Sequence, residues 1–288
     1  MEYLLSENLS GRYVFHVRPE TSPSVVVLML QVLDGPASLD DLANASGLKT
    51  SASQNEAVAE LRRLGLLQPR ALALTLRGHA LVTLSARRPH LVAEAVHAIY
   101  LRLAVEGTDA SRVGPGWAYR QVCASVWASG TGPFDRAGVI GRVVAGAAET
   151  FGLDEGRIAF SGKSVTGVTN WLGALEPPVY RRSGSPSTIM LRHVCPPEAV
   201  WWAVDAMHYA DGKRIPAGVR LPLAGDSAEL LCRQLLVHPA SLDRVLAQAK
   251  RRSDFSSGGI FDTGMAGGMG RWVLLSRELP PPCTDEHN

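Results

Sequence analysis

Five small polar residues near position 50 have side chains suited to hydrogen bonding. Gln and Asn can form two hydrogen bonds with the edge of an adenine, and Ser and Thr hydroxyls can bond either a base or a phosphate. Basic residues nearby have the charge needed to reach phosphates. The types and spacing of these residues therefore suit contact with double-stranded DNA. The polar residues are Thr50, Ser51, Ser53, Gln54 and Asn55, and the basic ones are Lys49, Arg62, Arg63 and Arg70.

The same residues have a simpler structural interpretation. The pattern from Ser51 to Gln54 is also that of a capping box, in which the hydroxyl and the amide only cap a helix. Arg62 and Arg63 would then form a solvated face of that helix. Glu56 and Glu60 lie on the same predicted helix and would repel phosphate if they faced outward. Both interpretations stay open.

A second group of hydroxyl and basic side chains lies between positions 161 and 192. Free N–H groups at a helix N-terminus bind anions, and arginines on a following hairpin would add positive charge. The alternative is an ordinary capped helix followed by a basic hairpin. The candidate DNA contacts in this group are Ser161, Lys163, Ser164, Thr166, Asn170, Arg181, Arg182 and Arg192.

The first group must be positioned by a set of short helices. Pro23 near the start of an apolar run and Gly35 just past its end predict a helix over 23–33. Ser38 is expected to cap a second helix over 39–45, whose first turn is acidic, as the helix dipole favours.

A third helix and a short hairpin are expected next. Val58, Leu61 and Leu64 recur at intervals of three and form one apolar stripe of a helix that ends at Gly65. The segment 66–76 then alternates in hydrophobicity around a polar Pro-Arg turn, which predicts two short strands.

The segment that leaves this hairpin carries a family resemblance. Leu74-Thr75-Leu76-Arg77-Gly78 closely resembles the L-T-x-x-G step by which winged-helix proteins leave the second wing strand and begin the next helix. The preceding residues 60–67 resemble the matching end of a recognition helix. In this order and spacing, residues 23–90 resemble the winged-helix superfamily, as in many bacterial regulators. The resemblance covers less than a third of the chain, and it implies that the third helix enters the major groove of DNA.

Beyond the resemblance, the chain is expected to continue as helices and short hairpins. A helix over 90–105 is expected to serve as a linker or dimerisation helix, and the polar, glycine-rich stretch 106–116 as a domain boundary. Asp135 is expected to cap a helix over 136–151. The order of elements in residues 117–195 repeats that of the first unit. A second winged helix is one interpretation, although this half lacks the characteristic sequence of the first.

The expected fold class is α+β, mainly α with short β-hairpins. The lead-in is expected to hold a strand over 12–17. Near the C-terminus, the glycine-rich run 258–270 is expected to be a flexible loop, followed by a strand over 271–275. The predicted divisions are a lead-in (1–22), a winged helix (23–90), a linker helix and loop (91–116), a second domain (117–195), a C-terminal α+β domain (196–277) and a disordered tail (278–288).

The sequence predicts neither a catalytic site nor a metal or cofactor site. Gly162-Lys163-Ser164 invites comparison with a P-loop, but Arg157 stands where the P-loop requires a glycine. His193 and Cys195 are close in the sequence, yet no further ligand or base follows at a suitable spacing. The four cysteines are scattered without a C-x-x-C pair, so neither a zinc site nor a disulfide framework is predicted.

Composition sets limits on the partners. A chain of 288 residues, 46% hydrophobic and 19% charged, can bury a proper core. The net charge of +2 permits a DNA partner but does not point to one, because a phosphate-binding face needs a local excess of charge. The first residues lack the features of a signal peptide, and no stretch has the length and apolarity of a membrane span. We therefore expect a cytoplasmic protein with no membrane partner.

Three hypotheses for the function follow from these observations. The leading one is a non-enzymatic bacterial DNA-binding protein that uses winged-helix modules on duplex DNA, as in transcription regulation. The second is a non-catalytic adaptor or DNA-recognition subunit that joins other protein subunits in a nucleic-acid-processing or antiviral phage-defence complex. The third is a ligand-sensing transcriptional regulator. The helix after the wing also leads us to expect a homodimer.

Overall fold

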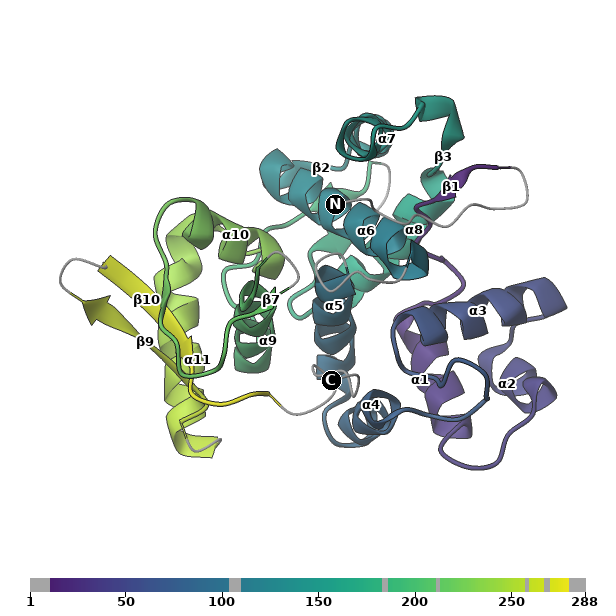
Figure 1. Ribbon diagram of the computed structural model, residues 1–288, viewed down its shortest axis with the longest axis horizontal. Helices are drawn as coiled ribbons and strands as arrows, with labels where there is room; N and C mark the ends of the chain where they lie inside the picture. The colour runs from purple at the N-terminus through teal and green to yellow at the C-terminus, as the bar shows by residue number, and fades with distance from the viewer. Residues whose placement is uncertain are drawn as a thin grey trace.

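The chain is mainly helical with small β-sheets, in agreement with the expected α+β class. Within the described residues, three successive groups of elements surround one central helix, α5 (Val92–Leu103) (Figure 1). We call these groups the first, second and third units. The computed structural model describes residues 11–103, 110–182, 186–210, 213–256, 259–266 and 270–279.

The first unit contains helices and a minimal hairpin. Ser38 and Asp41 exchange hydrogen bonds between side chain and backbone N–H, so the second helix has the predicted cap. Gly47 ends that helix with a φ of +68°, a conformation that favours glycine. After the third helix the chain turns back through a single antiparallel bridge between Leu67 and Leu74. The helices are α1 (Pro23–Val32), α2 (Leu39–Ser46), α3 (Ser51–Arg63) and α4 (Leu76–Arg87).

Local hydrogen bonds and close packing explain the sequence of the segment that joins the hairpin to α4. The Thr75 hydroxyl accepts a hydrogen bond from the Gly78 N–H at 3.1 Å, which caps α4, and donates one to the Gly65 carbonyl at 2.6 Å. A Cβ at Gly78 would lie 2.3 Å from the carbonyl oxygen of Leu66. Only glycine fits there, because the backbone of the hairpin touches the backbone of the helix.

The second unit consists of helices and a three-stranded sheet. Asp135 accepts a hydrogen bond from the Gly138 N–H at 2.9 Å and caps α7 as predicted. The predicted hairpin is joined by a further strand, β2, so that β5 lies between β2 and β4 and is antiparallel to both. The elements are α6 (Ala110–Ser129), β2 (Gly132–Pro133), α7 (Arg136–Phe151), β3 (Ile158–Ala159), α8 (Gly162–Ala174), β4 (Tyr180–Arg181) and β5 (Thr188–Ile189).

The third unit repeats the order of the second: helix, strand, helix, helix and hairpin. β10 lies between β8 and β9 and is antiparallel to both, so the strand that precedes the second helix again pairs with the last strand. A short strand pair, β6 with β7, follows the first helix of the unit. The elements are α9 (Pro197–Met207), β6 (Tyr209–Ala210), β7 (Lys213–Arg214), β8 (Leu221–Pro222), α10 (Asp226–Leu235), α11 (Leu242–Ser256), β9 (Phe261–Ala266) and β10 (Gly270–Leu275).

The glycine-rich run 258–270 was expected to be a loop, and this prediction is wrong. Much of it forms β9, which pairs with β10 along its whole length. Phe261 is fully buried, and the Thr263 hydroxyl donates to the Trp272 carbonyl at 2.8 Å. These contacts fix the strand despite Gly264. Residues 267–269 of the run lie outside the described residues.

Helix α5 is buried along its entire length. It contacts α1 and α4 of the first unit, α6 and α8 of the second and α9 of the third. A linker or dimerisation helix was expected here. Full burial contradicts a dimerisation role for α5, because the helix has no open face for a second copy of the chain.

His97 joins α5 to both the second and the third unit. Its Nε2–H donates to the Gln234 carbonyl at 2.7 Å, and its Nδ1 accepts from the Tyr119 hydroxyl at 2.8 Å. The tautomer is assigned from this network, since a carbonyl can only accept. Burial lowers the pKa of His97 to about 4, so the ring is neutral at neutral pH.

The predicted loop over 106–116 overlaps a helix. α6 begins at Ala110, because Val113 continues the buried face of that helix toward its N-terminus. The rest of the predicted loop, 106–109, lies outside the described residues, as do the last two residues of the helix predicted over 90–105. No helix in the described ranges, α6 included, is long and apolar enough to cross a membrane.

Both ends of the described chain take part in the core. β1 (Tyr13–Val14), within the predicted lead-in, pairs in parallel with β3 of the second unit. Leu279, in the predicted disordered tail, is buried because it packs on the core. One hydrophobic cluster extends from Phe15 to Leu279 and includes residues of all three units. Residues 1–10 and 280–288, where the rest of the lead-in and tail fall, lie outside the described residues.

Candidate nucleic-acid interface

The N-terminal turn of α3 presents much of the first predicted group to the surface. Thr50, and not Ser51 as expected, caps the helix, because its hydroxyl accepts a hydrogen bond from the Ser53 N–H at 3.2 Å. The predicted cap is therefore wrong by one residue, and the Ser51 side chain is left exposed. The exposed members of the group are Lys49, Thr50, Ser51 and Asn55, while Ser53 and Gln54 are half-buried.

The two amides on this turn differ in availability. The Gln54 side chain donates from Nε2 to the Leu48 carbonyl at 3.0 Å and so stabilises the turn before α3. This contact fits the structural interpretation of Gln54. The neighbouring Asn55 is exposed and is the better placed amide for a base edge.

The two acidic residues of α3 are compensated within the protein. Glu60 is fully buried, where it accepts a hydrogen bond from the Tyr100 hydroxyl at 2.6 Å and pairs with Arg63. Glu56 pairs with Arg18 at 2.7 Å. The repulsion of phosphate that the sequence suggested is thereby reduced. The same contact occupies Arg63, which was expected to reach phosphate.

Of the other basic residues predicted near α3, one is engaged within the protein and two are exposed. Arg62 donates from Nε to the Gln68 carbonyl at 3.3 Å and braces the hairpin. Arg70 lies on the exposed turn of that hairpin. Neither Lys49 nor Arg70 forms an ion pair with any described residue, so these two side chains are the cations best able to meet phosphates.

Helix α8 has the same place in the second unit that α3 has in the first, but it is covered. A Cβ at Gly167 would lie 2.3 Å from a carbonyl oxygen of the segment 16–19. The Ser164 hydroxyl is 2.6 Å from Nδ1 of His16, and Asn170 donates to a carbonyl of the same segment at 3.4 Å. The prediction that Ser164 contacts DNA is wrong, because this side chain is buried against the N-terminal segment.

Arg192 belongs to the same predicted group and is completely buried. Its Nη1 pairs with Glu94 of α5 at 2.5 Å, and both side chains are 0% exposed. Its Nε donates to the Leu235 carbonyl of α10 at 2.9 Å. The prediction that Arg192 contacts DNA is therefore wrong. It holds the second unit against α5 and the third unit.

The remaining members of the second group lie at the surface or near it. Thr166 accepts a hydrogen bond from Arg136 at 3.1 Å, which engages its hydroxyl within the unit. The structure thus separates the group into buried and exposed members and does not bring all of them to one face. Lys163, Arg181 and Arg182 are exposed, and Ser161, Thr166 and Asn170 are half-buried.

Helix α11, the third helix of the third unit, has a basic face that the sequence analysis did not select. Arg244 and Arg251 are exposed and lie two turns apart on the same side of the helix. The β9–β10 hairpin extends beyond α11 (Figure 1) and is held to it by an ion pair between Lys250 and Asp262 at 2.5 Å. The run of basic residues over 250–252 was the sequence signal for this surface.

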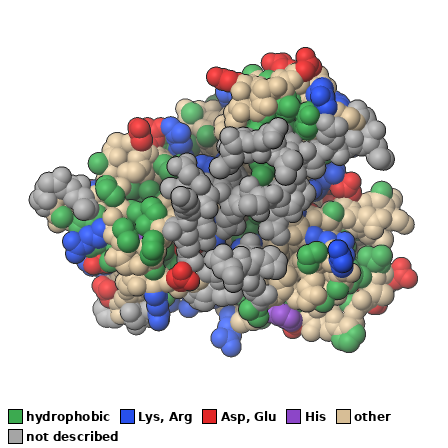
Figure 2. Space-filling model, in the orientation of Figure 1, with side chains coloured by type: hydrophobic (Ala, Val, Ile, Leu, Met, Phe, Trp, Pro, Cys, Tyr) green, Lys and Arg blue, Asp and Glu red, His purple; other side chains and the backbone are tan. Residues whose placement is uncertain are grey.

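The exposed charges do not form one continuous basic face on the side of the molecule shown in Figure 2. Lys and Arg side chains there form separate groups, with acidic side chains between them. This arrangement agrees with the small net charge of +2. An anionic partner would have to meet local groups such as those on α3 and α11.

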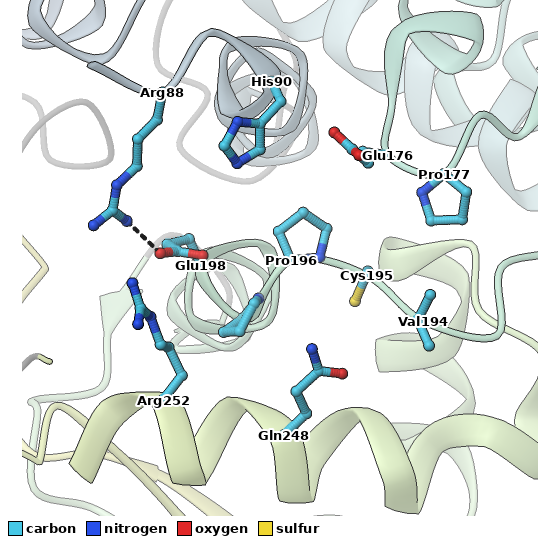
Figure 3. Close-up of a pocket in the computed structure, with 11 residues that line it drawn as sticks. Arg88, His90, Glu176, Pro177, Val194, Cys195, Pro196, Glu198, Gln248 and Arg252 are labelled. Atoms are coloured by element: carbon cyan, nitrogen blue, oxygen red, sulfur yellow. Dashed lines mark hydrogen bonds and ion pairs between the residues drawn. The ribbon is translucent and has the colours of Figure 1, made fainter. Parts of the chain in front are cut away.

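A cleft of about 420 Å³ lies between the ends of α4, α9 and α11. Arg88 and Glu198 form an ion pair at 2.5 Å on one side, and Gln248 and Arg252 extend toward it from α11 (Figure 3). Cys195 lines the cleft, but burial raises the pKa of its thiol to about 12. The thiol is therefore protonated at neutral pH and is not an activated nucleophile.

The other residue considered for metal or nucleophile chemistry is engaged elsewhere. His193 hydrogen bonds through Nδ1 with the Ser241 hydroxyl at 2.8 Å. Across the described ranges, no three or more His, Cys, Asp or Glu side chains lie close enough together to hold a metal ion.

Comparisons with known proteins found no match. No family model matches the chain, and no curated protein or solved structure does so either. The proposals below therefore depend on the order of the elements and on the chemistry of the exposed side chains.

Proposed function

We propose that this protein is a non-enzymatic DNA-binding protein, in which winged-helix-like units bind duplex DNA through the third helices α3 and α11. The observation that carries the proposal is the repeated order of elements. Apart from the short strands β3, β6 and β7, a helix, a strand, two helices and a hairpin follow one another in the second and third units, and the strand before the second helix pairs with the last strand. This is the order of a winged helix, and the first unit has the same helices with a minimal hairpin.

The chemistry of α3 supports the proposal. In helix-turn-helix proteins the N-terminal residues of the recognition helix meet base edges in the major groove. Ser51 and Asn55 are exposed at that end of α3 and can hydrogen bond with bases. Lys49 and Arg70 lie exposed before the helix and on the hairpin, and would contact phosphates on either side of the groove.

The chemistry of α11 supports a second contact of a different kind. Its exposed face carries Arg244 and Arg251, which suit phosphates as well as guanine edges. It lacks the small polar residues found at the start of α3. We therefore assign base reading mainly to α3, and non-specific attraction to the phosphate backbone mainly to α11.

A titration with fluorescently labelled duplex DNA at several salt concentrations tests the proposal. The wild-type protein should bind, with affinity that falls steeply as salt rises, because phosphate contacts release counterions. The double variant Arg244→Ala/Arg251→Ala should weaken binding to all sequences and make the salt dependence shallower by about one to two counterions. Lys49→Ala should have a smaller effect of the same kind.

A matched control is Arg87→Ala, which removes an exposed arginine of α4 that belongs to neither third helix. It should bind DNA like the wild type. The proposal fails if wild-type protein binds no duplex, or if the α3 and α11 variants bind as tightly as the control.

A protein-docking role is the second candidate, and one observation favours it. Three large apolar side chains of the first unit, Leu28, Leu39 and Leu76, are 41%, 42% and 58% exposed. Exposed apolar side chains are common in partner surfaces, although single ones also occur without a role. For this role we expect that the purified protein does not bind DNA by itself but copurifies with other subunits, and that Leu76→Ser abolishes the copurification. That result would identify an adaptor subunit of a larger complex.

A further inference from the structure

Arg120 on α6 is a half-buried cation without a partner. No described residue forms an ion pair or a hydrogen bond with its guanidinium, and burial lowers its pKa below the usual value for arginine. By contrast, the buried Arg102 and Arg192 pair with Asp205 and Glu94. The guanidinium is partly withdrawn from water, and no described carboxylate pairs with it to stabilise its charge. Its presence suggests that another group completes the site.

The guanidinium of Arg120 lines a small cavity between α6 and α10. The cavity has a volume of about 130 Å³, and its polar lining comes from Arg120, Gln121, Arg233 and Gln234. Gln234 is only 7% exposed, and its side-chain Oε1 has no hydrogen-bond partner. The cavity is therefore lined by an arginine without an ion pair among the described residues and by a largely buried amide.

A wider cleft of about 500 Å³ adjoins this cavity, since Ala124 and Arg233 line both spaces. Arg233 lines both spaces, where its guanidinium lies 5.5 Å from the Trp127 ring and pairs with Glu229. Arg142 lines the outer cleft. Three arginines thus follow the path from the outer cleft to the inner cavity, against a single carboxylate.

The lining selects for a ligand that accepts hydrogen bonds. Guanidinium groups bind the oxygens of a phosphate in a forked geometry. The amide N–H groups of Gln234 can donate a further hydrogen bond to a phosphate oxygen.

We infer that the cavity between α6 and α10 is a binding site for the phosphate group of a small molecule, with Arg120 as its inner cation. A cavity of about 130 Å³ has room for one phosphate group. The backbone of a duplex cannot enter it, because successive phosphates are held on a wide and stiff helix. The wider outer cleft gives space for the rest of the molecule. The site does not depend on DNA binding.

Isothermal titration with inorganic phosphate, in a phosphate-free buffer of low ionic strength, tests the inference. The wild-type protein should bind phosphate at one saturable site, and its Tm should rise with phosphate concentration. Arg120→Met keeps much of the side-chain volume and removes the charge. It should weaken phosphate binding at least about tenfold, and should leave the Tm without phosphate unchanged or higher.

Two further variants make the result specific. Gln234→Leu should also weaken phosphate binding, since it removes the second polar group of the cavity. Arg87→Met, which alters an exposed arginine elsewhere, should bind phosphate like the wild type. The inference is overturned if wild-type protein shows no saturable binding, or if Arg120→Met binds as well as Arg87→Met. A fall in the phosphate-free Tm of Arg120→Met would instead show that Arg120 has a purely structural role.

Competition with duplex DNA separates the two sources of phosphate. A small-molecule site should bind inorganic phosphate equally well with and without bound DNA, and Arg120→Met should bind DNA like the wild type. If bound DNA abolishes phosphate binding and Arg120→Met weakens DNA binding, the site belongs to the DNA backbone and the inference is wrong.

Discussion

Helices α3 and α8 hold the same place in the order of their units but have opposite surroundings. The first turn of α3 is exposed, with Ser51 and Asn55 at the surface. The corresponding turn of α8 is covered by the segment 16–19, and Ser164 there is 1% exposed. A small residue, Gly167, allows the covering backbone to approach. One helix can meet a partner from outside, and the other already has a partner within the chain.

The difference teaches that the order of elements and the local composition do not decide which surface is free. Both helices start with hydroxyl-rich, weakly basic sequences that suit phosphate binding. The sequence around α8 looked at least as favourable as that around α3. What separates them is a contact with residues about 150 positions away in the chain, as the hydrogen bond between His16 and Ser164 shows.

The largest expected effect concerns Arg192, the buried cation that follows the hairpin of the second unit and pairs with α5. Arg192→Met should destabilise the protein by about 3–5 kcal/mol, because it leaves the carboxylate of Glu94 buried and unpaired. Urea unfolding followed by circular dichroism measures this. Arg181→Met, on the exposed hairpin of the same unit, is the control and should change stability by less than about 0.5 kcal/mol. Equal effects of the two variants would contradict the burial of Arg192.

A smaller effect tests the covering of α8 itself. Gly167→Ala should destabilise by about 1–3 kcal/mol, because the new Cβ would push the segment 16–19 away from the helix. Gly141→Ala is matched to it, since Gly141 is exposed in α7 with no neighbouring atom within 4 Å. That control should stabilise by about 0.5–1 kcal/mol through helix propensity alone. If both variants were stabilising, the segment would not lie against α8.

The smallest effect tests the exposed turn of α3. Thr50→Ala should cost about 1 kcal/mol of stability, because the N-cap hydrogen bond to Ser53 is lost. Ser51→Ala should be neutral, since the Ser51 side chain lies in the first turn and does not cap the helix. Thermal unfolding of the two variants compares them directly. A larger loss of stability for Ser51→Ala than for Thr50→Ala would show that Ser51 caps the helix, as the sequence predicts.

Much of the local structure could be predicted from the sequence, because local contacts determine it. Ser38 and Asp135 cap their helices as expected, and Thr75 and Gly78 mark the entry into α4. These residues interact with neighbours three positions away. The cap of α3 was missed by one residue because Thr50 and Ser51 carry equivalent hydroxyls, and only the backbone conformation distinguishes them.

The candidate site could be predicted only in part. The exposed residues at the start of α3 were selected correctly as surface residues, whereas Arg192 and Ser164 were not. Their burial depends on long-range packing against α5 and the N-terminal segment. The residues next to them in the sequence do not indicate this packing. The cavity at Arg120 was missed for the same reason, since Arg120 and Gln234 are brought together only by the packing of α6 on α10.

Helix α5 has one more consequence for any DNA that touches both ends of the protein. The Tyr100 hydroxyl holds Glu60 of α3, and Arg102 pairs with Asp205 of α9 at 2.9 Å. Because α9 packs on α11, α3 and α11 are joined through the buried helix α5 and not through a flexible linker. If both helices bind DNA as proposed, binding of one would hold the other near a narrow stretch of the same duplex at high effective concentration. Such a protein would favour DNA whose path matches the fixed spacing between the two helices.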